Sequence, residues 1–312
     1  MQGIRTDLAL ETREDLASRG DLTDGILFDE TDFAGYKITE IAIMNDTAEE
    51  ITGRKRGNYI TVEFGKIWQA EYDEFVRLTE LIAEIIKKLS RIDPHVNRNP
   101  AILVAGLGNR FITADAIGPL AVSKILISRH IKEQIPELAN HLGGADISGI
   151  TPGVLGQTGI ESADILRSLA AIVKPQLVII IDSLASRKLS RLATTIQLSD
   201  TGISPGSGVG NHRQAINAEF LSVPRVISIG VPTVIDAATL AVDVIGEACR
   251  LNGTPMPREY PDIVNGSEAG SFFVTPKESD VIISEAAKVI GFAINRAFYA
   301  DLPFEEMARL VG

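Results

Sequence analysis

Two apolar runs constrain the fold of this chain more than any other feature of its sequence. The first, AILVAGLGN (101–109), stays apolar until its closing glycines and asparagine, and the second, LVIIID (177–182), stays apolar until its final acid. Runs of this kind are typical of strands that are buried on both faces of a parallel sheet. The sequence therefore predicts such a sheet, with polar or flexible residues at the ends of its central strands.

Helical patterns alternate with strand-like segments over the rest of the chain. This alternation predicts a single α/β domain with a mostly parallel sheet and helices on both faces. Further strands are expected at 194–200 and 225–232, and helices at 70–92, 115–131, 161–174, 236–251 and 275–298. In such a sheet the functional site is expected at the carboxyl ends of the strands.

The first 65 residues are expected to be an addition to this core. Residues 1–35 have little periodicity and are interpreted as a loosely held arm, whereas 36–45 and 58–65 alternate like the strands of a small β-hairpin element. The basic cluster Arg54-Lys55-Arg56 is interpreted as a solvated turn, with a contact patch as the alternative. A second irregular stretch, 252–270, is rich in proline and glycine and is expected to be a variable connection.

Composition excludes several classes of protein. The chain has 30 basic and 41 acidic residues and a net charge of −11, which argues against binding to nucleic acid through phosphates. Cys249 is the only cysteine, so a disulfide framework is impossible, and we expect a buried structural thiol. No apolar run is long enough for a membrane span and the N-terminus has no hydrophobic signal core, so we expect a soluble, intracellular protein without a membrane partner.

Two glycine clusters follow predicted strands. GLGNRF (106–111) lacks the third glycine of a dinucleotide fingerprint, and PGSGVGN (205–211) lacks the lysine and serine of a phosphate loop. The glycines are expected instead to let the backbone turn tightly and approach a ligand or another segment closely. The candidate substrate-loop residues of these clusters are Gly106, Gly108, Asn109, Gly206 and Gly208.

Two acids at predicted strand ends are the strongest catalytic candidates. Asp182 closes LVIIID, and Asp115 lies in the loop after the preceding core strand. Each has a purely structural alternative, as a helix cap or as an acceptor for loop amides, and Asp200 and Asp236 also follow predicted strands. Two carboxyl groups that meet across one crevice repel each other, so one pKa rises and the pair can share acid and base roles on a water molecule.

The stretch ISGITPGVLGQTGIE (147–161) supplies further candidates. Thr151 is expected to be a third polar group facing the same crevice, with Gly156 in an adjoining loop. The four histidines, His95, His130, His141 and His212, show no metal-ligand spacing, so neither a metal site nor a cofactor is expected.

Six longer motifs occur together and in order along the chain. They are VAGLGNRFITADAIGP, TPGVLGQTGIESADI, IDSLASR, TIQLSDTGISPGSGVGN, IGVPTVIDAATLA and VTPKESD. Together they closely resemble the spore germination protease family, the aspartic-type endopeptidases that degrade small acid-soluble spore proteins. The resemblance spans nearly the whole chain. It departs mainly at 252–270, which is shorter than expected of the Bacillus forms.

The resemblance implies a mechanism, a fold and a setting. Asp115 and Asp182 match the two proposed catalytic aspartates, and the fold is similar to the phosphorylase/hydrolase-like fold of the hydrogenase-maturation endopeptidases. The nickel-binding histidine of those enzymes has no evident counterpart here, which favours chemistry without a metal. The family also implies small acid-soluble spore proteins as substrates, a homotetramer, and a location in the cytoplasm of the forespore or spore core.

The family is made as a zymogen that removes a short N-terminal piece itself. TDLALE (6–11) has the hydroxyl, acid, apolar, small and acidic order of the sites that the family cuts in its substrates. The resemblance therefore implies a propeptide at 1–7, a cut between Asp7 and Leu8, and a peptidase domain at 8–312. The alternative is a chain end that resembles a substrate by chance.

Two other functions remain open at this point. One is a nickel-dependent peptidase of the hydrogenase-maturation type, which would respond to metal. The other is a module that binds phosphate or nucleosides through its glycine loops, which such ligands would stabilise. Cleavage of an acid-soluble spore protein would separate the endopeptidase from both.

Overall fold

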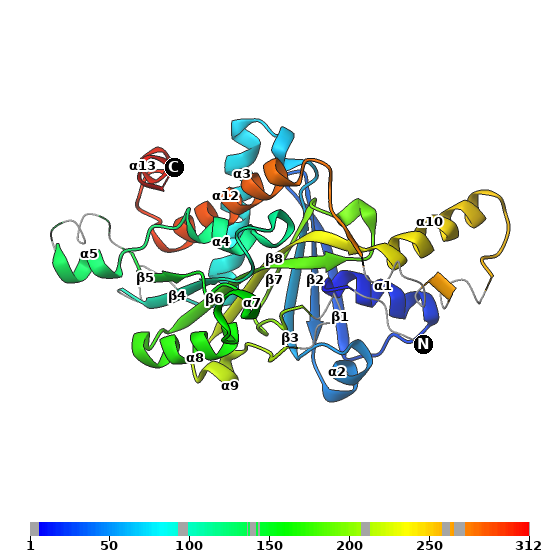
Figure 1. Ribbon diagram of the computed structural model, residues 1–312, viewed down its shortest axis with the longest axis horizontal. Coiled ribbons are helices and arrows are strands. Elements are labelled where there is room, and N and C mark those ends of the chain that lie inside the picture. The colour runs from blue at the N-terminus through cyan, green and yellow to red at the C-terminus, as the bar shows by residue number, and fades with distance from the viewer. Residues whose placement is uncertain are drawn as a thin grey trace.

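One mixed sheet organises the computed structural model, which describes residues 6–92, 99–135, 137, 142, 144–206, 213–257, 263–264 and 272–311 (Figure 1). Its strand order is β1-β2-β3-β7-β8-β6-β4-β5, and β9 pairs with β8. The strands are β1 (Ile26–Phe33), β2 (Tyr36–Ile43), β3 (Gly57–Glu63), β4 (Ala101–Gly106), β5 (Asp146–Ile150), β6 (Leu177–Ser186), β7 (Thr195–Ser199), β8 (Val226–Asp236) and β9 (Phe273–Val274).

The predicted parallel core is confirmed in four adjacent strands. β4 pairs in parallel with β5 and β6, and β6 pairs in parallel with β8. The remaining pairs are antiparallel, so the sheet as a whole is mixed: β7 joins β8 to β3, and β1, β2 and β3 form the predicted N-terminal β-rich addition. The addition therefore continues the main sheet instead of standing apart as a hairpin.

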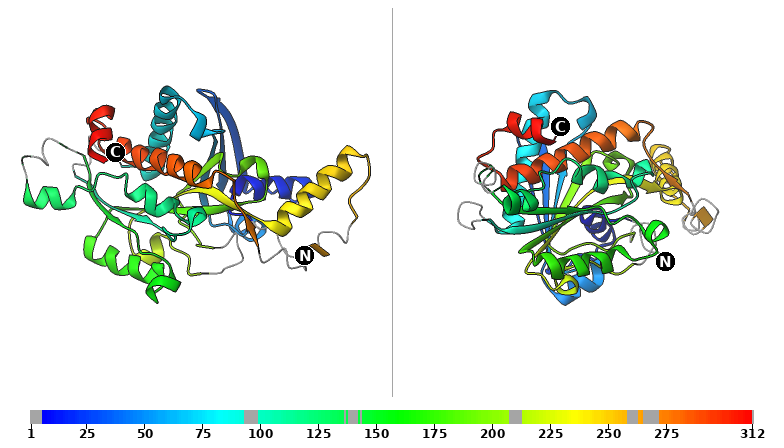
Figure 2. Two further views of the ribbon diagram at one scale, coloured as in Figure 1. Left: turned by 45° about the horizontal axis from the view of Figure 1, so that its top comes forward. Right: turned by 60° about the vertical axis from the view of Figure 1, so that its left-hand side comes forward.

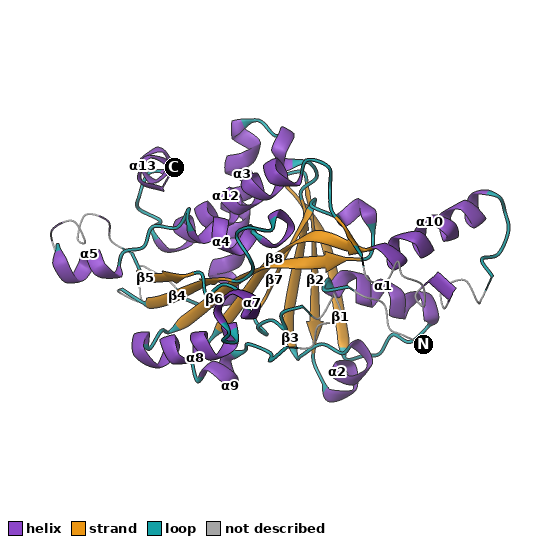
Figure 3. Cartoon of the chain, viewed as in Figure 1, coloured by secondary structure: helices purple, strands orange, loops and turns teal. Residues whose placement is uncertain are grey.

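Helices cover both faces of the sheet, as predicted (Figures 1 and 2). One face carries α3 (Tyr72–Ser90), α4 (Ile117–Val122) and α12 (Ser279–Phe298), and the other carries α8 (Ser162–Val173) and α9 (Ala218–Leu221). The other helices are α1 (Ala9–Arg19), α2 (Asp46–Thr52), α5 (Arg129–Gln134), α7 (Leu155–Thr158), α10 (Ala237–Leu251) and α13 (Phe304–Val311), and the single 3-10 turns are η1 (Ile67–Gln69), η2 (Thr113–Asp115) and η3 (Leu189–Arg191). Figure 3 shows the helices on either side of the strands.

The two apolar runs divide their side chains between these layers. In β4, Ile102 and Val104 join the core under α3 and α12, whereas Leu103 packs with the core under α8. Successive side chains of a strand point to opposite faces, so a continuous apolar run buries both. In β6 the set that includes Val178 and Ile180 lies on the α8 face.

Some predicted helices differ from those in the structure. The expected helix at 115–131 is broken into η2, α4 and α5, because Ile125 and Leu126 are buried and the Leu126 amide donates to Oδ1 of Asn295 (2.8 Å). α12 begins at Ser279, four residues later than expected, and the Thr275 hydroxyl donates to the Thr233 carbonyl (3.0 Å). Helix α2 separates the two strands of the expected hairpin.

The prediction of a loosely held N-terminal arm is wrong for its described part. α1 and β1 are regular elements, and Leu8 is fully buried. Ala9 and Leu10 pack with Ile41 and Tyr59 in a separate core between α1, β2 and β3. The burial comes from segments distant in the sequence, which local periodicity does not reveal.

Cys249 and the connection 252–270 differ from expectation or are described only in part. Cys249 lies on α10, as expected, but it is only half-buried. The connection 252–270 is described only at 252–257 and 263–264, so most of it lies outside the described residues. Within the described residues, no helix combines the length and the apolar character needed to cross a membrane.

Candidate active site

The loop after β4 carries Asp115 to the carboxyl end of the sheet. Gly108 has a φ of +104°, and a Cβ there would lie 2.1 Å from the Asp115 carbonyl oxygen, so the turn requires glycine. The Asn109 amide donates to Asp115 Oδ2 (2.7 Å), and the Thr233 hydroxyl donates to the Ala114 carbonyl (2.6 Å). These bonds fix η2, and with it the Asp115 carboxyl, between β4 and β8.

Asp182 lies in the neighbouring parallel strand, β6. It follows Val178 and Ile180 in the alternation of that strand, so its side chain is expected on the face covered by α8. Asp182 is only 7% exposed, and its Oδ1 accepts a hydrogen bond from the Ser183 amide (2.9 Å).

The surroundings raise the pKa of both carboxyl groups. Burial raises the pKa of Asp182 well above its ordinary value, and repulsion from Asp115 raises it further. Burial also raises the pKa of Asp115, whereas the hydrogen bond from the Asn109 amide opposes this change. Arg213 lowers both pKa values by its charge but does not reverse either shift. Of the two carboxyl groups, Asp182 therefore has the stronger tendency to hold a proton.

Both carboxyl groups line one cavity of about 520 Å³ at the carboxyl ends of the strands. Its walls come from the loop after β4, the end of β6, the start of α8, and residues before and after the undescribed stretch 207–212. Its lining includes Gly108, Asp115, Asp182, Ser183, Gly206 and Arg213. The Ser183 hydroxyl is buried and has no hydrogen-bond partner among the residues that the structure describes.

The N-terminal arm reaches the same cavity. Asp7 lines it, and the charge of Asp7 contributes to the raised pKa of Asp182. The Asp7 amide donates to the Ala185 carbonyl (2.9 Å), and the Ala185 amide donates to Asp7 Oδ2 (2.8 Å). The arm therefore pairs with the end of β6, three residues beyond Asp182.

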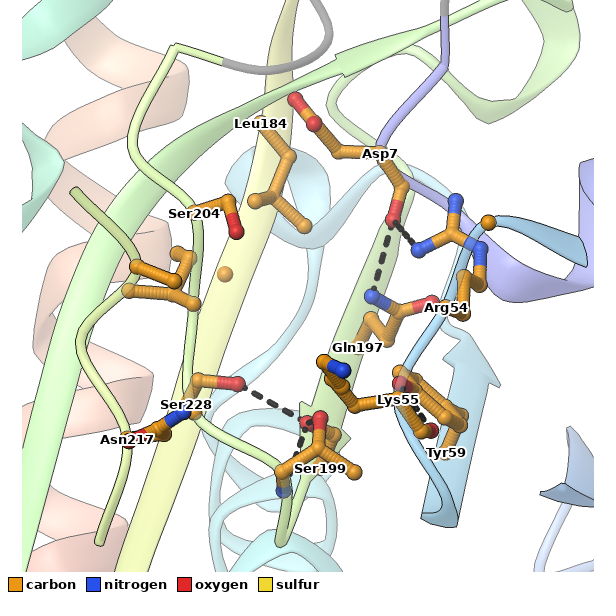
Figure 4. Close-up of a pocket in the computed structure, with 16 residues that line it drawn as sticks. Asp7, Arg54, Lys55, Tyr59, Leu184, Gln197, Ser199, Ser204, Asn217 and Ser228 are labelled. Atoms are coloured by element: carbon orange, nitrogen blue, oxygen red, sulfur yellow. Dashed lines mark hydrogen bonds between the residues drawn. The ribbon is translucent and has the colours of Figure 1, made fainter. Parts of the chain in front are cut away.

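Asp7 also borders a second cavity, of about 220 Å³, shown in Figure 4. There the Asp7 carbonyl accepts hydrogen bonds from Arg54 Nη1 (2.9 Å) and from Gln197 Nε2 (3.1 Å). In Figure 4 the carboxyl group of Asp7 points away from these two donors. The two cavities thus meet at Asp7, with its side chain facing the first and its carbonyl facing the second.

Arg54 corrects the interpretation of the basic cluster as a solvated turn. Its guanidinium donates to the Thr6 carbonyl (3.2 Å) and the Thr12 hydroxyl (3.1 Å) in addition to Asp7. Lys55 and Arg56 are exposed, as expected, and pair with acids of α2. Arg54 therefore contacts the N-terminal segment, in agreement with the alternative interpretation of the cluster as a contact patch.

The competing acids have structural surroundings of their own. Asp200 accepts hydrogen bonds from the backbone amide (2.7 Å) and the side-chain amide (2.8 Å) of Asn58, which fastens β7 to β3. Asp236 caps α10 by accepting from the Thr239 amide (2.8 Å). Neither lines the cavity of Asp115 and Asp182.

The predicted loop residues are only partly gathered at this cavity. Gly108 and Gly206 line it, Asn109 supports Asp115 from behind, and Gly106 lets the end of β4 approach Gly118 closely. Thr151 and Gly156 are exposed and are not among its lining residues. Gly208 lies outside the described residues, as do His95, His141 and His212.

Comparison with known proteins decides the family. The model of the family described as germination protease matches residues 5–257. This chain belongs to the germination protease family. It is 41% identical to the germination protease of Caldanaerobacter subterraneus subsp. tengcongensis, over 99% of this chain and 98% of that protein, and 37% identical to that of Clostridium perfringens strain ATCC 13124 over the full length of both. The germination protease of Bacillus pumilus is 40% identical over 97% of this chain and 95% of its own.

Among solved structures, a [NiFe] hydrogenase maturation protease, HycI from Thermococcus kodakarensis, matches with a TM-score of 0.36 and 15% identity, over 70% of this chain and 97% of its own. In the described part of this germination protease, no group of three or more His, Cys, Asp or Glu side chains is placed to hold a metal ion.

The structure adds residues that the sequence alone did not indicate. Arg213 lies beside the aspartates, and Arg54 and Gln197 hold the arm. Gln197 offered no clear signal, because it alternates with Ile196 and Leu198 as a solvent-facing strand residue would. Arg54 offered none either, because its neighbours in the basic cluster are exposed.

Proposed function

We propose that this germination protease is an aspartic-type endopeptidase that begins the degradation of small acid-soluble spore proteins. The observation that carries the proposal is that Asp115, in η2 after β4, and Asp182, in the adjacent parallel strand β6, line one cavity and both have raised pKa values. Two carboxyl groups that share a proton can activate a water molecule without any other catalytic group. The raised pKa values place the pair closer to the pH at which proton transfer is most efficient.

In the proposed reaction, Asp115 accepts a proton from water while Asp182 is protonated. The water oxygen adds to the scissile carbonyl carbon, and Asp182 donates its proton to the carbonyl oxygen. The C–N bond then breaks, a proton passes to the leaving amine, and the products are a carboxylate and an ammonium group. The deeper burial of Asp182 and the Asn109 hydrogen bond to Asp115 support this division of roles.

We also propose that the protein is made as a zymogen whose residues 1–7 are removed by its own cut between Asp7 and Leu8. Asp7 already lies at the cavity of the aspartates, held in an extended pairing with Ala185. Cutting should accelerate at mildly acidic pH, because protonation removes repulsion between Asp182 and its acidic neighbours.

The proposal also includes a homotetramer. The exposed apolar side chains Leu27 and Phe33, on the edge strand β1, offer a surface for contact between copies of the chain.

The test uses Asp115→Asn and Asp182→Asn with an acid-soluble spore protein as substrate. Each variant should stay folded and lose about 10²-fold or more of its activity, because an amide cannot accept or share the proton. Asp164→Asn, an exposed acid of α8, is the matched control and should keep full activity. Fragment masses report cleavage of the substrate, and the mass of the enzyme itself reports loss of residues 1–7. A folded Asp182→Asn variant with normal turnover would remove Asp182 from the mechanism.

A further inference from the structure

The second cavity contains a cation, Arg54, whose described hydrogen-bond partners are all neutral. The Arg54 guanidinium donates to two successive carbonyls, those of Thr6 and Asp7, and to the Thr12 hydroxyl. Within the described residues no carboxylate forms an ion pair with it. The charges of Asp7 and Glu11 raise the pKa of Arg54 from a greater distance, but burial outweighs them and lowers it below its ordinary value. A half-buried guanidinium whose hydrogen bonds all go to neutral groups is incompletely compensated for its lost hydration.

Gln197 completes the contact in a way that does not depend on the side chains of the peptide. Its Nε2 donates to the Asp7 carbonyl (3.1 Å), and its Oε1 accepts from the Ala9 amide (2.7 Å). Gln197 is only 8% exposed, so its orientation is set by β7. The side-chain amide thus pairs with the peptide backbone on both sides of the Asp7–Leu8 bond.

Hydrolysis of that bond would change the charge of the group that Arg54 and Gln197 hold. The Asp7 carbonyl would become a C-terminal carboxylate, with one oxygen supplied by water, while the nitrogen of Leu8 would leave as an ammonium. The carboxylate would form facing a guanidinium and an amide donor. Charge-assisted pairs of this kind are roughly twice as strong as hydrogen bonds to a neutral carbonyl.

We propose that Arg54 and Gln197 form a binding site for the C-terminal carboxylate of the fragment released on the N-terminal side of a cut. The ligand class is a peptide whose C-terminal residue is acidic, as Asp7 would be after the cut. The proposal rests on the proposed cut at Asp7–Leu8 for its biological meaning, but the site itself can be tested without any cleavage. If the site binds this carboxylate, the fragment from the N-terminal side of the cut dissociates last. The fragment then competes with new substrate for the site.

The cavity around this site is suited to a charged, hydrated end group. Hydroxyl groups of Ser199, Thr201 and Ser228 line it, and Ser199 bonds to both of the others. The Tyr59 ring lies 5.9 Å from the Arg54 guanidinium. Figure 4 shows Ser199, Ser228 and Tyr59 with Arg54 and Gln197 around this cavity.

The test measures displacement of the arm in the intact full-length chain. The probes are N-acetyl-Ile-Arg-Thr-Asp, the sequence of residues 4–7, as the free C-terminal acid and as the C-terminal amide. The readout is hydrogen exchange at the amides of Asp7 and Ala9, which are bonded to Ala185 and Gln197. The free acid should accelerate exchange at about a tenfold lower concentration than the amide, the factor expected when a neutral acceptor becomes charged.

Variants connect this preference to the two residues. Arg54→Met should abolish the preference for the acid, whereas Arg56→Met, which removes a neighbouring exposed charge, should retain it. If Arg54→Met does not fold, Gln197→Glu serves instead: it keeps an acceptor for Ala9 and should reverse or abolish the preference by repelling the carboxylate. The proposal is overturned if acid and amide displace the arm equally, if neither displaces it at millimolar concentration, or if folded variants keep the wild-type preference. Failure of the proposed cut would appear separately, as a chain that retains residues 1–7.

Discussion

Replacing Glu14 with glutamine should weaken the anchoring of α1 and lower the stability of the whole protein. Glu14 makes two short contacts to the buried Arg191 (2.7 and 2.6 Å) and one to Lys188 (2.7 Å). Burial raises the pKa of Glu14, but the hydrogen bonds from Arg191 and Lys188 more than offset this and lower it from 4.5 to about 2. These contacts join α1 to η3, in the connection that follows β6.

The pKa gives the size of the effect. The gap between 4.5 and about 2 corresponds to ~3.4 kcal/mol at ~1.36 kcal/mol per pH unit. Glu14 is only half-buried, so solvent screening reduces this to about 1–2 kcal/mol. Glutamine can still accept one hydrogen bond and Glu11 stays 3.6 Å from Arg191, which favours the lower end of that range.

Urea unfolding at several pH values is the assay. The pKa of Glu14 is lowered by folding, so its contribution is present above pH 4.5 and is lost as the pH falls toward 2. The difference between wild type and Glu14→Gln should therefore be full at pH 6–7 and less than half as large near pH 3. Glu247→Gln, which breaks an exposed pair with Arg250 on α10, is the control: Arg250 lowers the pKa of Glu247 too, but solvent screens the pair, so the difference from wild type should be small at every pH. An equal difference at pH 3 and pH 7 would refute the electrostatic reasoning.

Three further predictions concern the candidate active site. Asp182→Asn should be more stable than wild type at neutral pH, because the raised pKa makes ionisation of Asp182 unfavourable in the folded state. This advantage of the variant should vanish below about pH 3.8, where Asp182 is protonated in both the folded and the unfolded state. Urea midpoints at the two pH values test this, and a less stable variant at pH 7 would contradict it. Gly108→Ala should lose most activity and about 1–3 kcal/mol of stability, since its Cβ would collide with Asp115; normal kcat/KM would show that the position of Asp115 is unimportant. Exhaustive chelation should leave proteolysis unchanged, because two carboxylates without a histidine cluster form a poor transition-metal site; recovery of lost activity with nickel or zinc would contradict the proposed mechanism.

The parallel core and the position of Asp115 and Asp182 at its carboxyl end were predictable because their signals are local. A strand buried on both faces must be apolar throughout, so 101–109 and 177–182 identified β4 and β6, and an acid at the end of such a run needs a special environment. The pairing of Asp115 with Asp182 was not decided by sequence, since Asp200 and Asp236 follow strands as well. Only the strand order placed β4 beside β6 and showed the other two acids in structural contacts.

The arm was misread because its partners are distant in the sequence. Glu11 accepts hydrogen bonds from the amides of Arg187 and Lys188 (2.7 and 2.9 Å), more than 170 residues away. Seen alone, the acids of α1 resemble a solvated helix with a weak apolar face. In the folded protein, the acids Glu11 and Glu14 of α1 bind the basic segment 187–191 that follows β6.

This interface between α1 and the segment 187–191 explains how a segment can resemble a substrate and still be firmly held. On the C-terminal side of the Asp7–Leu8 bond, Leu8 is fully buried and Glu11 is bonded to backbone amides after β6. On the N-terminal side, the contacts are hydrogen bonds from Arg54 and Gln197 to backbone carbonyls and a pairing with Ala185. If the bond is cut, the C-terminal side keeps its apolar and ionic anchors as part of the folded chain. On the N-terminal side, another peptide backbone could replace the hydrogen bonds that Arg54 and Gln197 make to the Asp7 carbonyl, whereas the contacts of the Asp7 carboxyl group with Ala185 and of the Thr6 hydroxyl with Glu11 require an acid and a hydroxyl at the same positions.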